Sequence, residues 1–248
     1  MLPDGKGPFQ IHLGKSQIYF VPMNSENSLS PSQSEIFLAT EGDAWFQRNA
    51  DSFHSNPVFH SVDFILKTLD PFKEEIRCLV EIGCGPGYKL EKLFEGFRAN
   101  NGFGIDPSAL AISSARERVG ASQVDLDFQV GISSSLPFPP RVANLVFLGF
   151  FLYLVPREEI SLTVSEIDRI LKPGGFLAIE DFDAPVSIQN PYKHDERIVT
   201  YKDDYSKYLI NDFGYHLIEK HSYSHQFNFF AADPQERVAT TILFKPLK

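Results

Sequence analysis

A glycine-rich segment, VEIGCGPG at residues 80–87, constrains the fold of this 248-residue chain more than any other feature. It follows an apolar stretch at 76–82 that predicts a strand, and it precedes a segment at 88–97 with apolar residues at helical spacing. Glycines between a strand and a helix let the backbone approach a ligand closely, and the helix N-terminus offers free N–H groups. The segment is not a dinucleotide fingerprint, because Tyr88 occupies the last glycine position, and it lacks the GK[ST] ending of a P-loop. The pattern is instead E-x-G-x-G-x-G.

Strands and helices alternate after this segment, which indicates βαβ units and a parallel sheet with right-handed crossovers. Helices are predicted from Pro107 to about Val119, with the proline in the first turn, and over 158–171, where Lys172-Pro173-Gly174-Gly175 stops the helix. Further strands are predicted at 102–106, 124–130, 145–150 and 176–182. The tail predicts a helix at 203–212 and a closing antiparallel pair of strands at 215–223 and 238–244. The predicted fold is α/β: a Rossmann-like, doubly wound, mainly parallel seven-stranded sheet with helices on both faces.

The N-terminal part of the chain follows a different pattern. Residues 17–21 alternate as one strand of a small hairpin would, and the polar stretch 23–35 is typical of a linker or surface loop. Residues 36–49 favour a helix, although Gly42 argues against a single continuous one. We therefore expect an N-terminal extension and lid at residues 1–50 and the main domain at 51–248.

Asp106 ends the second predicted strand, roughly 20 residues past the last glycine of the loop, where an acidic residue accepts hydrogen bonds from ribose hydroxyls in doubly wound nucleoside sites. The alternative is a helix N-cap ahead of Pro107. Both roles can hold at once.

Four segments in this order resemble a class I S-adenosylmethionine-dependent methyltransferase across about residues 76–182. They are VEIGCGPGYKL, GFGIDPSALAISSARERV, GISSSLPFPPRVANLVFLGFFLYLV and LKPGGFLAIEDF. The resemblance implies S-adenosylmethionine as cofactor, with its ribose on Asp106, its adenine beside Ile132 and Ser133, and its methyl group facing the residues after the fourth strand. It implies further cofactor contacts along the same edge, at Glu81, Gly83, Cys84, Gly85, Gly87, Pro107 and Leu148.

Two positions depart from the family's pattern. An acid that accepts from the adenine amino group is common where this chain has Ile132, which offers only its backbone and an apolar contact. Asp is common where it has Asn144, a change that affects a cap or turn more than chemistry. Neither breaks the assignment.

Flanking segments resemble a narrower bacterial subgroup of methyltransferases associated with surface-polysaccharide and nucleotide-sugar pathways, over roughly residues 35–245. They lie at 41–49, 150–153, 190–194 and 201–206. The resemblance implies a small acceptor, such as a sugar or nucleotide-sugar hydroxyl or amine.

A polar and aromatic cluster precedes the main domain. In this fold a preceding helix often covers the cofactor, so Arg48 or Asn49 is a candidate for holding the methionine carboxylate, and Trp45 for shielding the sulfonium by cation–π attraction. The alternative is a solvated helix face with one buried tryptophan.

The acceptor site is expected above the carboxyl ends of the strands. A histidine near its ordinary pKa can remove the proton of a hydroxyl at neutral pH. His194 is therefore the predicted base, with Tyr153 and Asp181 as orienting groups; the alternative is a surface-loop role for His194. His216, His221 and His225 are interpreted as surface or core histidines, because His216 and His221 fall on opposite sides of a strand and form no metal-ligand set.

Composition narrows the possible partners. A net charge of −9 opposes binding to nucleic acid, and the longest apolar stretch, 145–155, is too short to span a bilayer. Two cysteines without a CxxC pair are typical of a reduced cytoplasmic protein, and no signal peptide is visible at the N-terminus. The alternatives to a small-molecule methyltransferase are a non-catalytic S-adenosylmethionine-binding module and an enzyme with a peptide or protein acceptor. The oligomeric state stays open.

Overall fold

The computed structural model describes residues 9–14, 17–22, 30–54, 59–120, 125–227 and 229–247. The chain divides into two compact units, residues 1–32 and 33–248. In the first unit, β1 (Phe9–Gly14) and β2 (Gln17–Pro22) pair antiparallel, with Ile11 opposite Phe20. The predicted hairpin strand at 17–21 is therefore confirmed. Most of the predicted loop at 23–35 lies outside the described residues.

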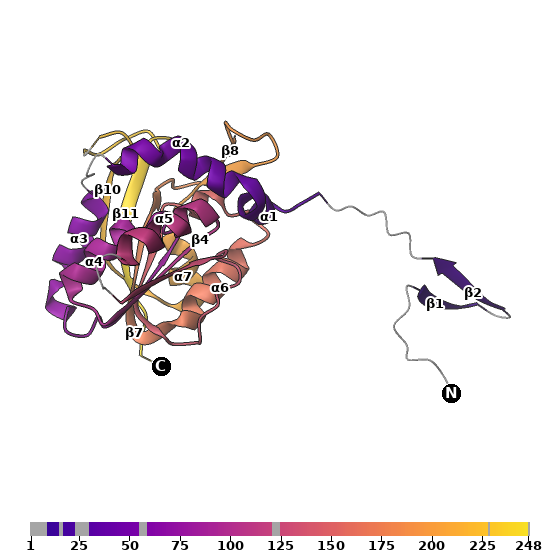
Figure 1. Ribbon diagram of the computed structural model, residues 1–248, viewed down its shortest axis with the longest axis horizontal. Helices are drawn as coiled ribbons and strands as arrows, with labels where there is room; N and C mark the ends of the chain where they lie inside the picture. Colours follow the sequence, from indigo (N-terminus) through magenta and orange to yellow (C-terminus); the bar gives the residue numbers. More distant parts are fainter. Residues whose placement is uncertain are drawn as a thin grey trace. The chain divides into compact units, whose positions relative to one another are not determined.

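A seven-stranded sheet organises the second unit, in the order β10-β11-β7-β6-β3-β4-β5 (Figure 1). Its strands are β3 (Cys78–Ile82), β4 (Asn101–Asp106), β5 (Leu126–Val130), β6 (Ala143–Gly149), β7 (Leu171–Phe182), β10 (His216–Ser224) and β11 (Arg237–Phe244). β11 runs antiparallel to β7 and β10, and the other neighbours are parallel. The predicted mainly parallel, doubly wound sheet is confirmed, including its antiparallel closing pair.

Helices cover both faces of this sheet. On one face lie α3 (His60–Leu69), α4 (Tyr88–Phe97) and α5 (Ala109–Gly120), and on the other lie α6 (Ile160–Ile170) and α7 (Ser206–Phe213). Neighbouring side chains of β3 point to opposite faces of the sheet. Leu79 packs in the hydrophobic core under α3, α4 and α5, and Val80 packs in the core under α6 and α7. Both faces of β3 are therefore buried, as an apolar central parallel strand requires.

The stop signal at 172–175 ends the helix as predicted but does not make a loop. The helix ends at Ile170, and β7 already begins at Leu171, which pairs with Ala143. The register then shifts, so that Phe176 pairs with Leu145. The prediction of a strand starting at 176 was wrong because the Pro-Gly-Gly segment is absorbed as an irregularity inside the strand.

The N-terminus of α5 also differs from the prediction. The helix begins at Ala109, so Pro107 precedes the first turn. The Ser108 hydroxyl accepts a hydrogen bond from the N–H of Ala111 at 3.0 Å, which makes Ser108 the N-cap. The alternative of Asp106 as N-cap is therefore wrong.

Gly42 does not break the N-terminal helix. Residues 33–54 form α1 (Gln33–Ile36), a π-helical turn at Phe37–Glu41 and α2 (Gly42–His54). Gly42 has helical angles, φ −56° and ψ −49°. A Cβ atom there would lie 2.8 Å from the carbonyl oxygen of Phe37 and 3.0 Å from the nitrogen of Ser108. The glycine is thus needed for close approach between this helix and the start of α5 rather than for a turn.

Asp43 ties α2 to α5. Its Oδ1 accepts hydrogen bonds from the hydroxyl of Ser108 at 2.7 Å and from the N–H of Leu110 at 2.9 Å. The first turn of α5 is therefore capped from another helix. Because of such contacts, residues 33–50 belong to the larger unit, and the division after residue 32 falls before the expected boundary after residue 50.

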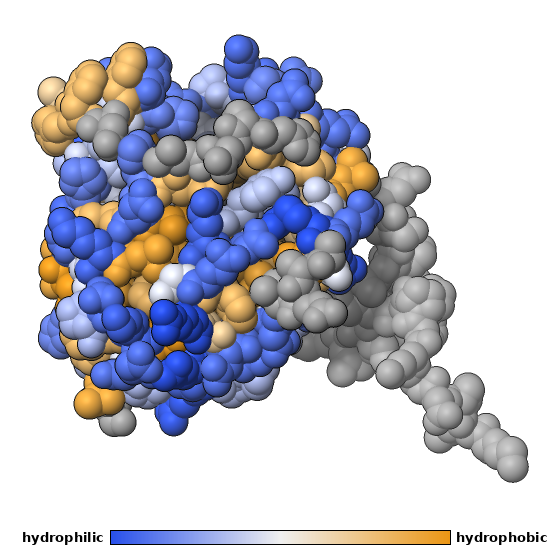
Figure 2. All heavy atoms as spheres, turned by 60° about the vertical axis from the view of Figure 1, so that its left-hand side comes forward, coloured by the Kyte–Doolittle hydropathy of each residue, from blue (hydrophilic) through white to orange (hydrophobic). Residues whose placement is uncertain are grey.

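The remaining elements are short. They are two 3-10 turns, Asp70–Phe72 and Leu152–Leu154, and a small antiparallel hairpin of β8 (Ile188–Pro191) and β9 (Val199–Lys202). The face shown in Figure 2 is mostly hydrophilic, with apolar side chains in separate patches. None of the helices in the described part of the chain is long and apolar enough to cross a membrane.

Candidate active site

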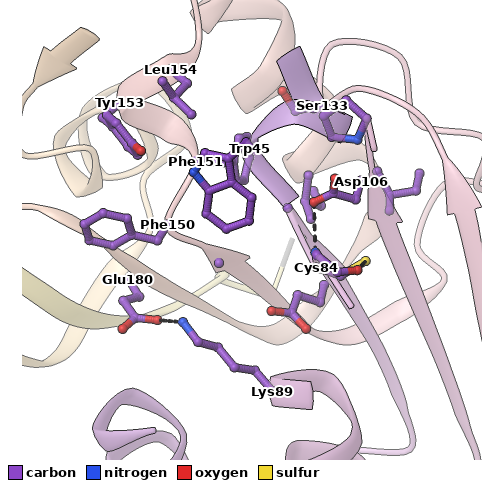
Figure 3. A pocket seen from close by; sticks show the side chains of 18 of the residues that line it. Trp45, Cys84, Lys89, Asp106, Ser133, Phe150, Phe151, Tyr153, Leu154 and Glu180 are labelled. Atoms are coloured by element: carbon purple, nitrogen blue, oxygen red, sulfur yellow. Dashed lines mark hydrogen bonds and ion pairs between the residues drawn. The ribbon is translucent and has the colours of Figure 1, made fainter. Parts of the chain in front are cut away.

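A cavity of about 440 Å³ lies at the carboxyl ends of the parallel strands. The chain leaves β3 toward β4 and β5 on one side and returns to β6 on the other, so β3 and β6 form the topological switch point, where ligands bind in this class of fold. The lining comes from the loop after β3, the ends of β4, β6 and β7, and the helix at 33–54 (Figure 3).

The glycine loop presents its backbone to this cavity. Gly83, Gly85 and Gly87 all have positive φ, at 73°, 51° and 78°. A Cβ atom on Gly85 would meet nothing within 4 Å, because that position faces open space, whereas one on Gly87 would lie 2.4 Å from the ring of Phe128. Gly85 therefore leaves room for a ligand, and Gly87 leaves room for the protein's own packing.

Asp106 connects the glycine loop to the start of α5. Its Oδ2 accepts from the N–H of Gly85 at 2.8 Å and its Oδ1 from the N–H of Ser108 at 2.9 Å. Burial raises the pKa of Asp106 to about 6, and these two N–H groups oppose the rise. Each carboxylate oxygen keeps a lone pair for a further donor, so the side chain can accept from hydroxyl groups in the cavity.

Glu81 is buried on the floor of the cavity, with 1 % of its surface exposed. Burial raises its pKa to about 8, and the nearby Lys89 opposes the rise. Its Oε2 is buried and has no hydrogen-bond partner in the described part of the chain. A buried carboxylate oxygen without a partner favours a cationic ligand group beside it.

Lys89 and Tyr223 join Glu180 in a network, and the sequence analysis did not identify Lys89 or Tyr223 as part of the site. The Lys89 ammonium pairs with Glu180 across the cavity floor (Figure 3), and the Tyr223 hydroxyl donates to Glu180 at 3.2 Å. Lys89 also lies 5.7 Å from the ring centroids of Phe59 and Phe147. The available signal was positional, because Lys89 lies in the first turn of the helix after the glycine loop and Glu180 lies near the carboxyl end of a strand.

The backbone after β6 is strained at the edge of the cavity. Phe150 has φ 62°, a left-handed value that a bulky residue rarely adopts, and its N–H donates to the carbonyl of Glu180 at 2.9 Å. Its ring packs against Tyr153, Phe182 and His225, with centroids 5.4, 5.3 and 5.3 Å away. Such strain is characteristic of functional sites. Here the strained backbone directs the Phe150 ring into the part of the cavity lined by Phe150, Tyr153, Tyr223 and His225, which we call the Phe150 chamber.

Other predicted cofactor residues are distributed unevenly around the cavity. Cys84, Pro107, Ile132 and Ser133 line it, whereas Leu148 is fully buried in the core below it. The Cys84 thiol is buried, and burial raises its pKa well above the ordinary value, so it packs rather than reacts.

The helix at 33–54 contributes Trp45 and Asn49 to the cavity lining. Figure 3 shows the indole of Trp45 projecting into the cavity between Phe150 and Asp106. Asn49 donates to the carbonyl of Trp45 at 2.8 Å. Arg48 does not line the cavity; it pairs with the buried Glu41 and donates to the Tyr192 hydroxyl at 3.2 Å.

Of the three predicted catalytic residues, Tyr153 and Asp181 are neighbours and His194 lies apart from them. Tyr153 lines the cavity, and burial raises the pKa of its hydroxyl. Asp181 is 2 % exposed beneath the turn at Leu152–Leu154, where it accepts from the N–H groups of Phe182 at 2.7 Å and Tyr153 at 3.4 Å; burial raises its pKa to about 7. His194 is exposed in the turn between β8 and β9, packs beside Tyr192 and does not line the cavity.

Among the residues that the structure describes, the histidine that lines the cavity is His225. The sequence analysis interpreted it as structural. His221, Tyr223 and His225 stand at alternate positions, which places their side chains on one face of an extended segment. His225 also lies just past the carboxyl end of the strand predicted at 215–223. This position and the alternate spacing together were the signal that could have identified His225 as a residue of the site.

Comparisons with known proteins agree with this geometry. Residues 80–179 match the family model described as "Methyltransferase domain". This segment is therefore similar to methyltransferase domains, and the solved structures share its fold. The match agrees with the resemblance of the glycine loop and Asp106 to the methyltransferases that use S-adenosylmethionine.

Two curated relatives that match this part of the chain are named for different acceptors. A malonyl-[acyl-carrier protein] O-methyltransferase of Coxiella burnetii is 30 % identical over 115 residues, which are 46 % of this chain and 37 % of that protein. A trans-aconitate 2-methyltransferase of Paracidovorax citrulli is 36 % identical over 102 residues, 41 % of this chain and 37 % of that protein. The chain thus spans less than half the length of these relatives.

A solved structure shows the fold over nearly the whole chain. The 1,6-didemethyltoxoflavin-N1-methyltransferase of Burkholderia thailandensis, solved with its substrate and S-adenosylhomocysteine, has a TM-score of 0.66 and 10 % identity. The match covers 96 % of this chain and 99 % of that one. The methyltransferase fold therefore extends well beyond the segment 80–179 that the family model matches.

Proposed function

We propose that the protein transfers a methyl group from S-adenosylmethionine to a neutral hydroxyl or amine of a small acceptor. The observation that supports this most is the division of one cavity into two parts. Asp106 and the glycine loop line one part, and Phe150, Tyr153, Tyr223 and His225 line the other. A cofactor in the first part would face an acceptor in the second.

The side chains of the first part fit the cofactor. The unpartnered, buried Oε2 of Glu81 suits the cofactor's ammonium group, and the open space at Gly85 suits its methionine chain. Asp106 would hold the ribose hydroxyls, with residues 131–133 beside the adenine. Leu148 would not contact the cofactor; it would pack in the core beneath the residues that line the cofactor part of the cavity.

The helix at 33–54 would act as a lid. Trp45 and Asn49 already line the cavity, and the Asp43 hydrogen bonds hold α2 against α5. Trp45 would shield the sulfonium through cation–π attraction, and Asn49 is better placed than Arg48 to receive the methionine carboxylate.

The charge of the cavity favours a neutral acceptor. The carboxylates of Asp106 and Glu180 face one ammonium among the described lining residues, that of Lys89, which Glu180 already pairs; Glu81 adds a further negative charge when it gives up its proton in the bound cofactor's field. This excess of acid attracts the cationic cofactor and repels an anionic acceptor. Aromatic walls accommodate a ring or the apolar face of a sugar, so a sugar or nucleotide-sugar hydroxyl or amine remains the proposed acceptor. A carboxylic acid is the second candidate, because the relatives' names include malonyl and aconitate.

The protein's part in the reaction is alignment, exclusion of water and control of one proton. S-adenosylmethionine supplies an activated methyl group when bound. Trp45 and the Phe150 chamber would exclude water, and the glycine loop would fix one reactant relative to the other. Tyr153 and Tyr223 would orient the acceptor through their rings and hydroxyl groups.

The test is transfer of isotopically labelled methyl groups from S-adenosylmethionine into a metabolite extract separated into low-mass and protein fractions. The proposal expects label in neutral low-mass compounds, with much less transferred by the Asp106→Ala variant when S-adenosylmethionine is below saturation. Label in carboxylic acids would favour the second candidate. Label only in the protein fraction would indicate a protein acceptor, and binding without any transfer would indicate a binding module; either result would overturn the proposal.

A further inference from the structure

His225 lies at the same edge of the sheet as the cofactor loop. It directly follows β10, and its N–H donates to the carbonyl of Glu236 at 2.7 Å, so the pairing of β10 with the chain before β11 continues one residue further. β10 and β7 both pair antiparallel with β11 and are therefore parallel to each other. The carboxyl end of β10, with His225, thus lies beside the carboxyl end of β7, with Glu180 and Phe182.

The imidazole of His225 is fixed by packing and keeps its nitrogens available. Its ring stacks on Phe150, at 5.3 Å between centroids and 21° between planes, and lies 5.7 Å from the ring of Phe182. Neither nitrogen makes a hydrogen bond to the described residues, and the side chain is exposed at the mouth of the cavity that it lines. The strained Phe150 therefore positions a histidine whose nitrogens are open to a ligand.

Charges from three elements act on this imidazole. Desolvation against the phenylalanine rings lowers the pKa of His225 below 6.5, and Lys202 of β9 adds to the decrease. Glu236 before β11 and Glu180 of β7 oppose it. The net direction is downward, so the ring is neutral at pH 7 and can accept a proton.

We propose that His225 is the general base of the methyl transfer. The proposal rests on the function proposed above. As the acceptor oxygen forms its bond to the methyl carbon, the carbon–sulfur bond breaks and its electron pair stays on sulfur. The hydroxyl proton passes to a ring nitrogen of His225, and the imidazolium then releases it to water at the cavity mouth. A hydroxyl acceptor needs this step because its own pKa lies far above 7.

Neither of the two alternative bases fits as well. Glu180, the carboxylate nearest the Phe150 chamber, is already engaged by Lys89 and by the Tyr223 hydroxyl. His194 is exposed outside the cavity lining. His225 combines a position in the lining with an unoccupied ring.

One experiment needs no acceptor. The imidazole signals of the full chain are titrated by NMR in complexes with S-adenosylmethionine and with S-adenosylhomocysteine, which differ by one methyl group and one positive charge. If His225 faces the methyl group, its pKa will be lower in the S-adenosylmethionine complex, while the pKa of His221 stays unchanged. Equal pKa values for His225 in the two complexes would overturn the proposal.

A second experiment measures the reaction with the low-mass fraction as acceptor. His225→Gln is expected to lower kcat about 10²–10⁴-fold, to remove the acidic limb of the pH–rate profile and to leave S-adenosylhomocysteine affinity unchanged. The matched control is His221→Gln, an exposed histidine on the same strand, which should keep wild-type rates. A loss below about threefold in His225→Gln would contradict the role of His225. No transfer by the wild-type protein would instead refute the proposed function.

Discussion

Three buried carboxyl groups at the ends of parallel strands share one physical property. Burial raises the pKa of Glu81 to about 8, of Asp181 to about 7 and of Asp106 to about 6. Only two of them line the cavity, since Asp181 caps backbone N–H groups beneath the 3-10 turn. The sequence therefore predicts that an acidic residue near a strand end belongs to the site or its support. Whether it lines the cavity or caps backbone N–H groups depends on the face of the strand that it occupies. The two residues Glu180 and Asp181 point to different faces for this reason.

The raised pKa values predict how stability depends on pH. Because the folded protein holds these protons more tightly than the unfolded chain, their contribution to stability is complete below about pH 4 and is lost as the pH rises through 6 to 8. The thermal unfolding midpoint of the cofactor-free protein should therefore fall between pH 5 and 8. Glu81→Gln should reduce this dependence near pH 8. A midpoint that rises steadily over the same range would contradict the account.

Cofactor binding should release a proton from Glu81. If the cofactor's ammonium lies beside this carboxyl group, it stabilises the charged form and lowers the pKa of Glu81 from about 8. Calorimetric titration at pH 7 in two buffers of different ionisation enthalpy should then give different heats for the wild type. The difference should shrink in Glu81→Gln. Identical heats for the wild type would place the ammonium elsewhere.

The course of the helix at 33–54 was predicted poorly from the sequence. Gly42 was interpreted as a break, because an isolated glycine weakens a helix. The structure uses it inside the helix, directly after a π-helical turn, where a Cβ atom would meet the backbone of Ser108. A contact between residues so far apart in sequence has no local signal. The same limit applies to Lys172–Gly175, where pairing with β6 overrides the tendency of Pro-Gly-Gly to form a loop.

Trp45 provides a direct measurement of what this helix does. It is the single tryptophan of the chain, so its fluorescence reports on one place in the molecule. Titration with S-adenosylhomocysteine should change the emission of Trp45, because its indole lies in the cavity. Trp45→Ala should weaken cofactor binding by about 2- to 30-fold, the range of a partly desolvated cation–π contact for the sulfonium form. Phe46→Ala is the control, since Phe46 does not line the cavity itself and packs behind the lining residue Phe53. Calorimetric binding without an emission change would contradict the lid.

At the scale of the whole molecule, the order of strands and helices and the location of the cofactor half of the site could be predicted from sequence. Local sequence patterns were enough for both predictions, because the glycine loop directly follows one strand and Asp106 ends the next. The acceptor half could not be predicted in the same way. His225 and Glu180 come together only through the sheet order β10-β11-β7, and Lys89 reaches Glu180 from α4, so these residues are separated by long stretches of sequence. His194 matched the expected chemistry, but the β8–β9 hairpin holds it outside the cavity lining.

The division of the chain after residue 32 predicts the effect of two truncations. Removal of residues 1–32 leaves the larger unit whole, so this unit should still unfold cooperatively. Its affinity for the cofactor should change by less than about twofold, which is well under 1 kcal/mol. Removal of residues 1–50 also deletes Trp45, Asn49 and the cap that Asp43 provides for α5, and should weaken binding markedly. Thermal unfolding and calorimetry on both truncated chains test this. Equal affinity in the two would argue against a lid.

The central claim is that S-adenosylmethionine binds between the glycine loop and Asp106. The most direct measurement is calorimetric titration of S-adenosylhomocysteine into the wild type and into Asp106→Ala, with circular dichroism to verify folding. Loss of hydrogen bonds to a carboxylate costs about 1.5–3 kcal/mol, so the variant should bind roughly 10- to 100-fold more weakly. An unchanged affinity in a folded Asp106→Ala protein would contradict the account.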